Sequence, residues 1–343
     1  MPDRTDAQRS EEKALGALGE SWRTDYKDWK KHASITTVPG TLRKYQQAVL
    51  GEFLPWVLQQ PDIKQASDLT PRHFVRFTDY LRATPNRKNG EKRSSATVRS
   101  YQVPTSLFLD WLAGNTKKMD PFGKLPMVPV LKPKPKDIDI LTDVEYANLV
   151  AAAERIGTKR DVVFLHALDG TGCRCDEMVT ITAGGMYFRE GHYITVIGKT
   201  VKYTGPRPVP VTPDLYKELR SLLPPDATPD TPVFSTKTRS KKTKKYEALS
   251  ASGLAQMIDK LCLATADPTG KIDQHGDPVP MRRVGPQRFR RRYASRMSRH
   301  PKMDKDTLAA IMGTSAKVLD DFYIRRDARD KTVHEAAMEA LGG

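Results

Sequence analysis

The sequence is poor in cysteine and in long apolar runs. It has 3 cysteines in 343 residues, too few for the disulfide framework of a small secreted domain. No apolar run approaches the roughly 18 residues that a membrane-spanning helix needs. The opening segment MPDRTDAQRSEEK also has no apolar stretch typical of a secretory signal. We therefore expect a cytosolic protein with free thiols and no membrane association.

Acidic residues are in the minority. The chain has 57 Lys and Arg against 41 Asp and Glu, which gives a net charge of +16. A protein of this charge favours a polyanion as its partner, and DNA or RNA is the first choice. The length suits two domains.

Metal-ligand patterns are missing as well. Cys173 and Cys175 flank Arg174 in GTGCRCDEM, but a structural zinc site normally needs four protein ligands, and no second pair of Cys or His lies nearby. We interpret the two cysteines as small buried side chains and expect no metal site.

The N-terminal part of the chain is predicted to be helical. Residues 1–38 are polar, and we expect an arm with a short helix around SWRTDYKDWKKHA that either folds against DNA or a neighbouring subunit or stays solvated. Residues 39–130 show helical periodicity in several segments, which predicts a small all-helical domain with basic residues on its outer faces. Pro55 and Pro104 are expected to bend or break two of its helices.

The C-terminal part follows a predicted linker over 131–138, where proline and lysine alternate and favour an extended connector. Residues 139–343 combine helices with three short antiparallel strands in MYFREGHYITVIGKTVKYTGPRPVPV. A lysine-rich loop, STKTRSKKTKKYEA, comes next, and the final TVHEAAMEALGG forms a short amphipathic tail helix. The expected fold class is therefore mainly α with a small antiparallel β-sheet.

Four motifs occur in order along the chain: GTGCRCDEM, VIGKTVK, GPQRFRRRYAS and IMGTSAKVLDDFYIRR. In number and spacing they resemble the tyrosine recombinase family, the lambda-integrase-like site-specific DNA recombinases. That family has an arginine after a T-G turn, a lysine in a small β-hairpin, and H-x-x-R at the start of a helix. A G-H or G-W pair follows, and a tyrosine lies nine residues after it. The likeness runs from about Thr41 to beyond Tyr323, and the helical domain over 39–130 resembles the family's core-binding domain, which implies that it binds DNA.

The resemblance implies a role for each matching residue. Arg174 and Arg290 would hold the scissile phosphate by bidentate contacts, and Tyr323 would be the nucleophile. Lys199 would be the general acid, with Lys202 as the alternative in the same hairpin. Glu177 would orient Arg174. Five further basic residues would contact the DNA backbone: Lys202, Arg207, Arg288, Arg291 and Arg292.

Two positions depart from the family pattern. Gln287 stands where the H-x-x-R histidine is usual, and Thr314 stands where the second histidine or tryptophan is usual. Both can donate a hydrogen bond to a phosphate oxygen, but neither titrates near neutral pH. His275 and His300 are alternative histidines that would have to reach the site through space. We expect a functional but variant site.

The function implied is metal-free and ATP-free recombination without a cofactor. The protein would close as a two-domain clamp on double-stranded DNA at a specific site and form a covalent 3′-phosphotyrosyl link. By family resemblance it would act as a synaptic tetramer through a Holliday junction, with the tail packing on a neighbouring subunit. Its setting would be the cytoplasm, on bacterial, phage or plasmid DNA.

Two other functions fit the same motifs. A non-catalytic DNA-binding accessory protein on a recombinase scaffold is motivated by Gln287 and Thr314, and it would be indifferent to Tyr323→Phe. A type IB topoisomerase-like enzyme would share the Arg-Lys-Arg-Tyr chemistry without requiring paired specific sites.

Overall fold

The computed structural model describes residues 6–86, 90–115, 138–198 and 205–324. The chain divides into two compact units, Met1–Lys136 and Asp137–Gly343. The predicted linker lies outside the described residues except for Ile138, as does the predicted tail helix. Within the described ranges, no helix is long and apolar enough to cross a membrane.

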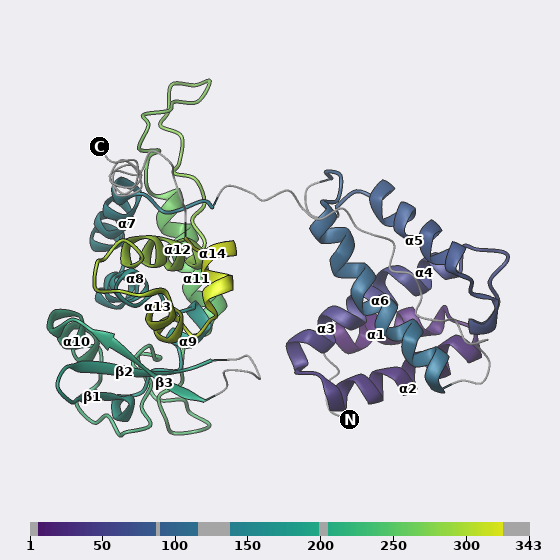
Figure 1. Cartoon of the computed structure of the whole chain (residues 1–343), viewed down its shortest axis with the longest axis horizontal. Coiled ribbons are helices and arrows are strands. Elements are labelled where there is room, and N and C mark those ends of the chain that lie inside the picture. The colour runs from purple at the N-terminus through teal and green to yellow at the C-terminus, as the bar shows by residue number, and fades with distance from the viewer. Residues whose placement is uncertain (1–5, 87–89, 116–137, 199–204, 325–343) are drawn as a thin grey trace, which may run out of the picture. The chain divides into compact units, whose positions relative to one another are not determined.

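The first unit is helical over its described residues (Figure 1). Its longest element, α6 (Ser95–Asn115), runs beside the other helices around an aromatic core that includes Phe53, Phe77 and Phe108. The remaining elements are α1 (Asp6–Gly16), α2 (Glu20–Thr36), α3 (Pro39–Ala48), the π-helix η1 (Val49–Phe53), α4 (Leu54–Val57), the short η2 (Ala66–Asp68) and α5 (Pro71–Ala83).

The N-terminal segment differs from its prediction as an arm. Trp22, Tyr26 and Trp29 of α2 are buried in the core of the first unit, with 2%, 0% and 2% exposure. The Trp29 ring makes an edge contact with Phe108 at a centroid distance of 5.2 Å. The three aromatic residues are spaced by four and three positions, so they share one face of a helix. Residues 6–36 are therefore part of the helical unit.

Neither Pro55 nor Pro104 ends the helix in which it lies. Pro55 lies in α4, which continues α3 through the π-helix η1, so the helical path passes from residue 39 to residue 57 with one wide turn. α6 is continuous through Pro104. Glu52 lies in this wide turn, its carboxylate pairs with Arg93 at 3.1 Å, and both side chains are almost fully buried.

The second unit combines nine short or medium helices with one small sheet in its described residues. α8 (Lys159–Thr171) is central and packs against α12 (Pro286–Met297). The strands and α10 gather at one end of the unit (Figure 1). The other elements are α7 (Asp143–Ile156), α9 (Cys175–Met178), η3 (Ala183–Gly185), α10 (Pro213–Arg220), α11 (Ala251–Leu263), α13 (Lys305–Met312) and α14 (Ala316–Phe322).

The sheet is antiparallel in the order β1 (Met186–Phe188), β2 (His192–Ile197) and β3 (Pro206–Val211). Met186 pairs with Ile194, and Ile194 pairs with Val209, so one buried face runs across all three strands. The prediction of a mainly α chain with a small antiparallel sheet is confirmed.

Local sequence explains where the helices begin. Thr142 accepts a hydrogen bond from the Glu145 backbone N–H at 3.2 Å, and the Glu145 carboxylate accepts one from the Thr142 backbone N–H at 2.9 Å. This capping box satisfies N–H groups that a helix start leaves unpaired. Ser250 and Asp304 cap α11 and α13 in one direction only, since their side chains accept from the backbone N–H groups of Gly253 and Thr307.

Candidate active site

The turn that precedes Arg174 requires glycine. Gly172 ends α8 with φ +62°, in the left-handed region. A Cβ on this residue would meet the Tyr293 ring at 2.3 Å, so there is also no room for a side chain. Its carbonyl accepts a hydrogen bond from Arg290 Nη1 at 2.8 Å. The turn thus connects both predicted clamp arginines, because Arg174 follows Gly172 by two residues and Arg290 binds the Gly172 carbonyl.

Arg174 stands at the start of α9 and is fixed by Glu177. Its backbone N–H donates to Glu177 Oε2 at 2.8 Å, and its Nη1 donates to Glu177 Oε1 at 3.0 Å. The Arg174 side chain is 32% exposed, whereas that of Glu177 is 2% exposed. The guanidinium is therefore held from below by a carboxylate and still faces solvent, as a phosphate-binding group requires.

Arg290 is fully buried and held by main-chain carbonyls. Besides Gly172, it donates through Nη2 to the carbonyl of Met312 at 2.6 Å. Its Nη1 also lies 3.8 Å from Glu177 Oε2. Burial lowers its pKa, and the charge of Arg174 adds to that effect. An arginine still remains charged at neutral pH, so Arg290 is a fixed positive charge beneath the site.

The Arg290 Nε has no hydrogen-bond partner within the described part of the chain. Its guanidinium carbon lies 4.9 Å from the centroid of the Tyr323 ring. This distance suits a cation–π contact. This contact joins Arg290, the second predicted clamp arginine, to Tyr323, the predicted nucleophile.

Tyr323 follows α14 and is 5% exposed. Its hydroxyl accepts a hydrogen bond from Gln287 Nε2 at 2.8 Å. Burial raises the pKa of Tyr323, but the charges of Arg290 and Arg174 and the amide of Gln287 lower it more, so the net pKa lies below the ordinary value. The phenol is thus easier to ionise than a tyrosine in water.

Gln287 and Thr314, the two positions that depart from the family pattern, make different contacts. Gln287, in the first turn of α12, contacts the Tyr323 hydroxyl. Thr314 follows α13 and is half-buried, with its backbone N–H on the Ala309 carbonyl at 3.0 Å. Its side chain makes no hydrogen bond within the described ranges. His275 and His300 contact Gln274 and the backbone of Lys302 instead, and neither touches Tyr323 in the residues described.

Lys199 and Lys202 lie outside the described residues. The strands on either side, β2 and β3, end and begin at Ile197 and Pro206. The Ile197 backbone N–H donates to the Thr180 hydroxyl at 3.0 Å, which ties the end of β2 to the segment after α9.

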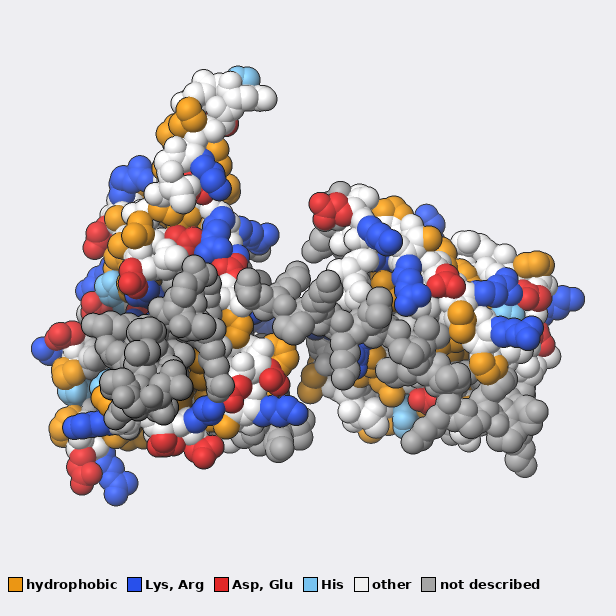
Figure 2. All heavy atoms as spheres, turned by 45° about the horizontal axis from the view of Figure 1, so that its top comes forward, with side chains coloured by type: hydrophobic (Ala, Val, Ile, Leu, Met, Phe, Trp, Pro, Cys, Tyr) orange, Lys and Arg blue, Asp and Glu red, His pale blue; other side chains and the backbone are white. Residues whose placement is uncertain are grey.

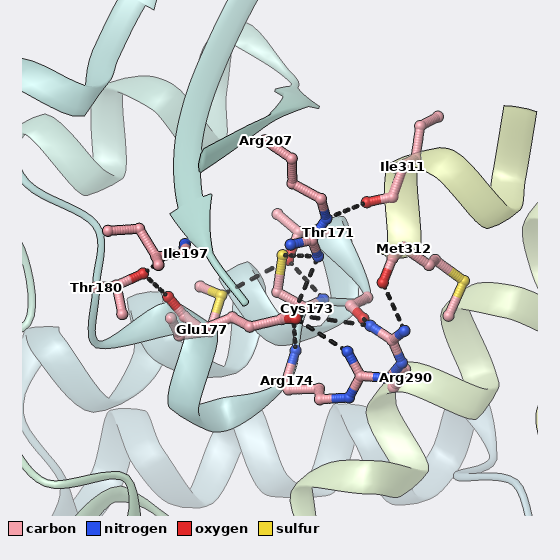
Figure 3. A network of polar contacts seen from close by, with 12 residues as sticks. Thr171, Cys173, Arg174, Glu177, Thr180, Ile197, Arg207, Arg290, Ile311 and Met312 are labelled. Carbon is pink, nitrogen blue, oxygen red and sulfur yellow. Dashed lines mark hydrogen bonds and ion pairs between the residues drawn. The ribbon is translucent and has the colours of Figure 1, made fainter. Parts of the chain in front are cut away.

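Arg207, which was predicted to contact the DNA backbone, makes several contacts within the protein. Its side chain is 16% exposed and donates to Glu177 Oε2 at 3.0 Å and to the Ile311 carbonyl at 3.1 Å. Figure 3 shows this guanidinium reaching from β3 into the same polar network as Arg174 and Arg290. Its partners are 30 and 104 residues away in the chain, so no local pattern pointed to them.

Three arginines of α12 that were predicted to contact the DNA backbone also have partners within the protein. Arg292 Nε pairs with Asp169 at 2.8 Å and its guanidinium lies over the Tyr146 ring. Arg288 pairs with Asp139, and Arg291 donates to the Asp139 carbonyl at 3.3 Å. These contacts attach α12 to α8 and to the first residues of the unit. Most of the charge in this basic run is therefore compensated within the protein.

Uncompensated positive charge occurs elsewhere. Residues 235–248, here called the lysine hairpin, carry five exposed lysines that form no ion pair within the described residues: Lys237, Lys241, Lys242, Lys244 and Lys245. The hairpin is closed by the Thr236 N–H to Glu247 carbonyl bond at 2.9 Å. Figure 2 shows that, on the face in view, other Lys and Arg side chains are interspersed with acidic ones.

Cys173 and Cys175 pack inside the second unit as free thiols. Cys173 is buried next to Arg207, and Cys175 Sγ donates to the Ala251 carbonyl at 3.2 Å. Within the described ranges, no three His, Cys, Asp or Glu side chains are grouped so that they could hold a metal ion.

Comparison with known proteins identifies the fold. No family model matches the sequence, and no curated protein matches it. The chain is similar to the XerH site-specific recombinase bound to its difH substrate in a pre-cleavage complex, with 14% identity, a TM-score of 0.60 and coverage of 91% of this chain and 82% of that one. It is also similar to a lambda integrase dimer bound to a COC' core site, with 13% identity, a TM-score of 0.61 and coverage of 96% and 83%.

A third solved structure, the Tn1549 transposon integrase in complex with transposon right end DNA, has 14% identity and a TM-score of 0.59, with coverage of 93% and 98%. The chain therefore has the fold of the tyrosine recombinases and integrases over nearly its whole length.

Proposed function

We propose that this protein is a site-specific DNA recombinase that cleaves and rejoins strands through a covalent 3′-phosphotyrosyl link at Tyr323. The observation that carries the proposal is the setting of the phenol. Its oxygen accepts a hydrogen bond from Gln287 at 2.8 Å, and its ring lies 4.9 Å from the Arg290 guanidinium. A buried tyrosine that serves only packing has no need of two such groups.

The arginine pair supplies positive charge where the reaction develops negative charge. In phosphoryl transfer, charge spreads over the non-bridging oxygens of the transition state, and preorganised donors stabilise it. Arg174 is partly exposed and can bind these oxygens directly. Arg290 is fully buried, with Nη1 and Nη2 on main-chain carbonyls, so it supplies positive charge from beneath the phosphate. Glu177 orients Arg174 and two main-chain carbonyls orient Arg290, so both positive charges are in place before DNA binds.

The chemical step balances without an added reagent. The Tyr323 oxygen attacks phosphorus, a new P–O bond forms to tyrosine, and the bond from phosphorus to the 5′ oxygen breaks. The phenol loses its proton to solvent water, and the departing 5′ oxygen takes up a proton from Lys199 or Lys202. Rejoining is the reverse reaction with the 5′ hydroxyl of another strand. One phosphodiester replaces another, so no nucleotide cofactor is required.

Charge and fold support DNA as the substrate. The net charge of +16 favours a polyanion. Three proteins of the same fold have been solved on DNA, among them a lambda integrase tetramer bound to a Holliday junction, which is 14% identical to this chain with a TM-score of 0.60. We infer that the helical unit and the second unit together bind duplex DNA, and that strand exchange takes place in a tetramer.

The contact of Gln287 favours a variant enzyme over an inactive relative. Gln287 keeps the hydrogen bond to the nucleophile, and a pKa of Tyr323 below the ordinary value lessens the need for a general base. An accessory protein that only binds DNA would gain nothing from this arrangement.

The experiment is a covalent capture assay. The protein is incubated in EDTA with nicked duplexes from the DNA flanking its gene, and denatured samples are analysed for protein-linked DNA. An adduct that maps to Tyr323 and is lost in Tyr323→Phe supports the proposal. Tyr187→Phe, at a partly exposed tyrosine of β1, is the matched control and should retain the adduct. Tight DNA binding without any adduct would favour the accessory function.

The general acid is tested with a modified leaving group. Lys199→Ala and Lys202→Ala are compared on DNA with an ordinary 5′ oxygen and with a bridging 5′ sulfur, which leaves without protonation. The variant that lacks the general acid should be slow on the first substrate and restored on the second. Dependence on paired sites then separates recombination from topoisomerase-like relaxation.

A further inference from the structure

Arg207 and Arg290 both contact the end of α13 and the carboxylate of Glu177. Arg207 donates to the carbonyl of Ile311, and Arg290 donates to the carbonyl of the next residue, Met312. Both guanidiniums also face the carboxylate of Glu177, Arg207 at 3.0 Å and Arg290 at 3.8 Å. Two arginines from different elements thus bridge the end of α13 to one buried acid (Figure 3).

The contact geometry uses properties that only arginine has. A guanidinium is a planar fork whose N–H groups point in several fixed directions. Arg207 uses Nε for Ile311 and Nη2 for Glu177, and Nη2 also lies 3.8 Å from Cys173 Sγ. With these partners and 16% exposure, its guanidinium is committed within the protein and has little surface left for DNA.

Gly313 provides the space for this contact. It ends α13 with φ +59°, and a Cβ there would lie 2.8 Å from Arg207 Nε and 3.0 Å from Cζ. The glycine therefore allows both the left-handed turn and the close approach of Arg207. Thr314 follows at once, and Tyr323 lies beyond α14, so this contact is at the start of the segment that carries the nucleophile.

We propose that Arg207 is a positioning residue for strand cleavage. By bridging Glu177 and the end of α13, it fixes the distance between the two groups that hold Arg290, and so keeps Arg290 under the scissile phosphate. It acts through Glu177 and α13 and does not touch the DNA. This inference rests on the proposed recombinase function.

The test separates a positioning role from a DNA contact. Arg207→Met and Arg207→Lys are compared with Arg189→Met, which removes an exposed arginine between β1 and β2. For each variant, the dissociation constant for DNA and the single-turnover rate of adduct formation at saturating protein are measured. Thermal unfolding identifies variants that do not fold.

We expect Arg207→Met to lower the saturated cleavage rate by about 10- to 100-fold, because a misplacement of about 1 Å has an effect of that order. Its dissociation constant for DNA should stay within about threefold of the wild-type value, which is less than the roughly tenfold change that corresponds to 1.4 kcal/mol. Arg207→Lys should recover part of the rate, because it keeps the charge beside Glu177 but cannot bind both partners in the same way. Arg189→Met should match the wild type in rate.

A double substitution tests the path of the effect. In a Glu177→Gln background, Arg207→Met should have a smaller effect on the cleavage rate than in the wild type, because the two residues act through one contact. Fully additive effects would contradict the proposal.

Three other outcomes would overturn it. A weaker dissociation constant with an unchanged saturated rate would make Arg207 a DNA contact. Unchanged rate and affinity in a folded Arg207→Met would leave it no role in cleavage. If Arg207→Met does not fold, a folded Arg207→Lys with the full wild-type rate would show that the bridging geometry is dispensable. A wild-type protein that binds DNA but forms no adduct refutes the proposed function itself, and this inference with it.

Discussion

The side-chain amide of Gln287 donates a hydrogen bond to the hydroxyl of Tyr323 across 36 residues of sequence, at 2.8 Å. An amide N–H at a phenol oxygen stabilises the ionised form of that oxygen, but it cannot take up the proton. The nucleophile is thus oriented and polarised by a group that does not titrate. This relationship leads directly to the first two predictions.

Replacement of Gln287 by leucine should slow adduct formation at Tyr323. Leucine has a similar volume but no N–H, and a hydrogen bond to a charged group contributes about 1.5–3 kcal/mol, or roughly 10- to 100-fold in rate. The measurement is the single-turnover rate on a nicked duplex. Gln256→Leu, on the exposed side of α11, is the control. Equal rates for the two variants would show that the contact is irrelevant to cleavage.

The ionisation of Tyr323 should be visible in the free protein. Its pKa is lowered from 10.0, so as pH rises its tyrosinate should form before that of an ordinary tyrosine. The measurement is an ultraviolet titration of the wild type minus that of Tyr323→Phe, over about pH 7 to 11. Gln287→Leu should move the transition to higher pH. A difference transition at or above pH 10 in the wild type would refute the prediction.

Substitution of Gly172 by alanine should destabilise the second unit. The added Cβ would meet the Tyr293 ring at 2.3 Å, and φ +62° strains any side chain. Left-handed strain alone costs about 1–3 kcal/mol, and overpacking adds a similar amount. The midpoint of thermal or urea unfolding measures the loss. Gly205→Ala, where no atom lies within 4 Å, should be close to neutral, and equal losses would contradict the explanation.

The lysine hairpin should contribute sequence-independent affinity for DNA. Each phosphate contact adds about 0.9 to the slope of log K against log salt concentration, so Lys241→Gln with Lys244→Gln should reduce the slope by up to about 1.8. Affinity for specific and random duplexes should fall equally. The control removes the same charge from paired lysines, Lys217→Gln with Lys305→Gln. Equal slopes in the two double variants would exclude the hairpin as a phosphate-binding element.

Patterns confined to a short stretch predicted their structure well. The three strands of the sheet and their antiparallel order followed from β-branched residues separated by turn residues. The placement of Glu177 against Arg174 is likewise local, because the two lie one helical turn apart and the backbone N–H of one can bond the side chain of the other. Such contacts depend on spacing that a sequence displays directly.

Contacts between distant segments were not predictable in this way. Arg292 and Asp169 are 123 residues apart, and nothing in the basic run of α12 distinguishes an arginine that pairs internally from one that faces solvent. Arg207 was assigned to DNA for the same reason. The burial of Trp22, Tyr26 and Trp29 is a different case. Their spacing did indicate one apolar face, but the surrounding charges favoured a solvated arm, and only the packing against Phe108 decides between the two.

The outer edge of the sheet has a consequence for how copies of this protein can associate. Pro206, Pro208 and Pro210 occupy alternate positions of β3, and the ladder with β2 uses the N–H groups of the residues between and after them. The positions that face outward therefore carry acceptors and no donors. A strand from another molecule could not complete a ladder there. The sheet therefore ends at β3 by the chemistry of its own backbone, and another copy of this protein cannot extend the sheet past that strand.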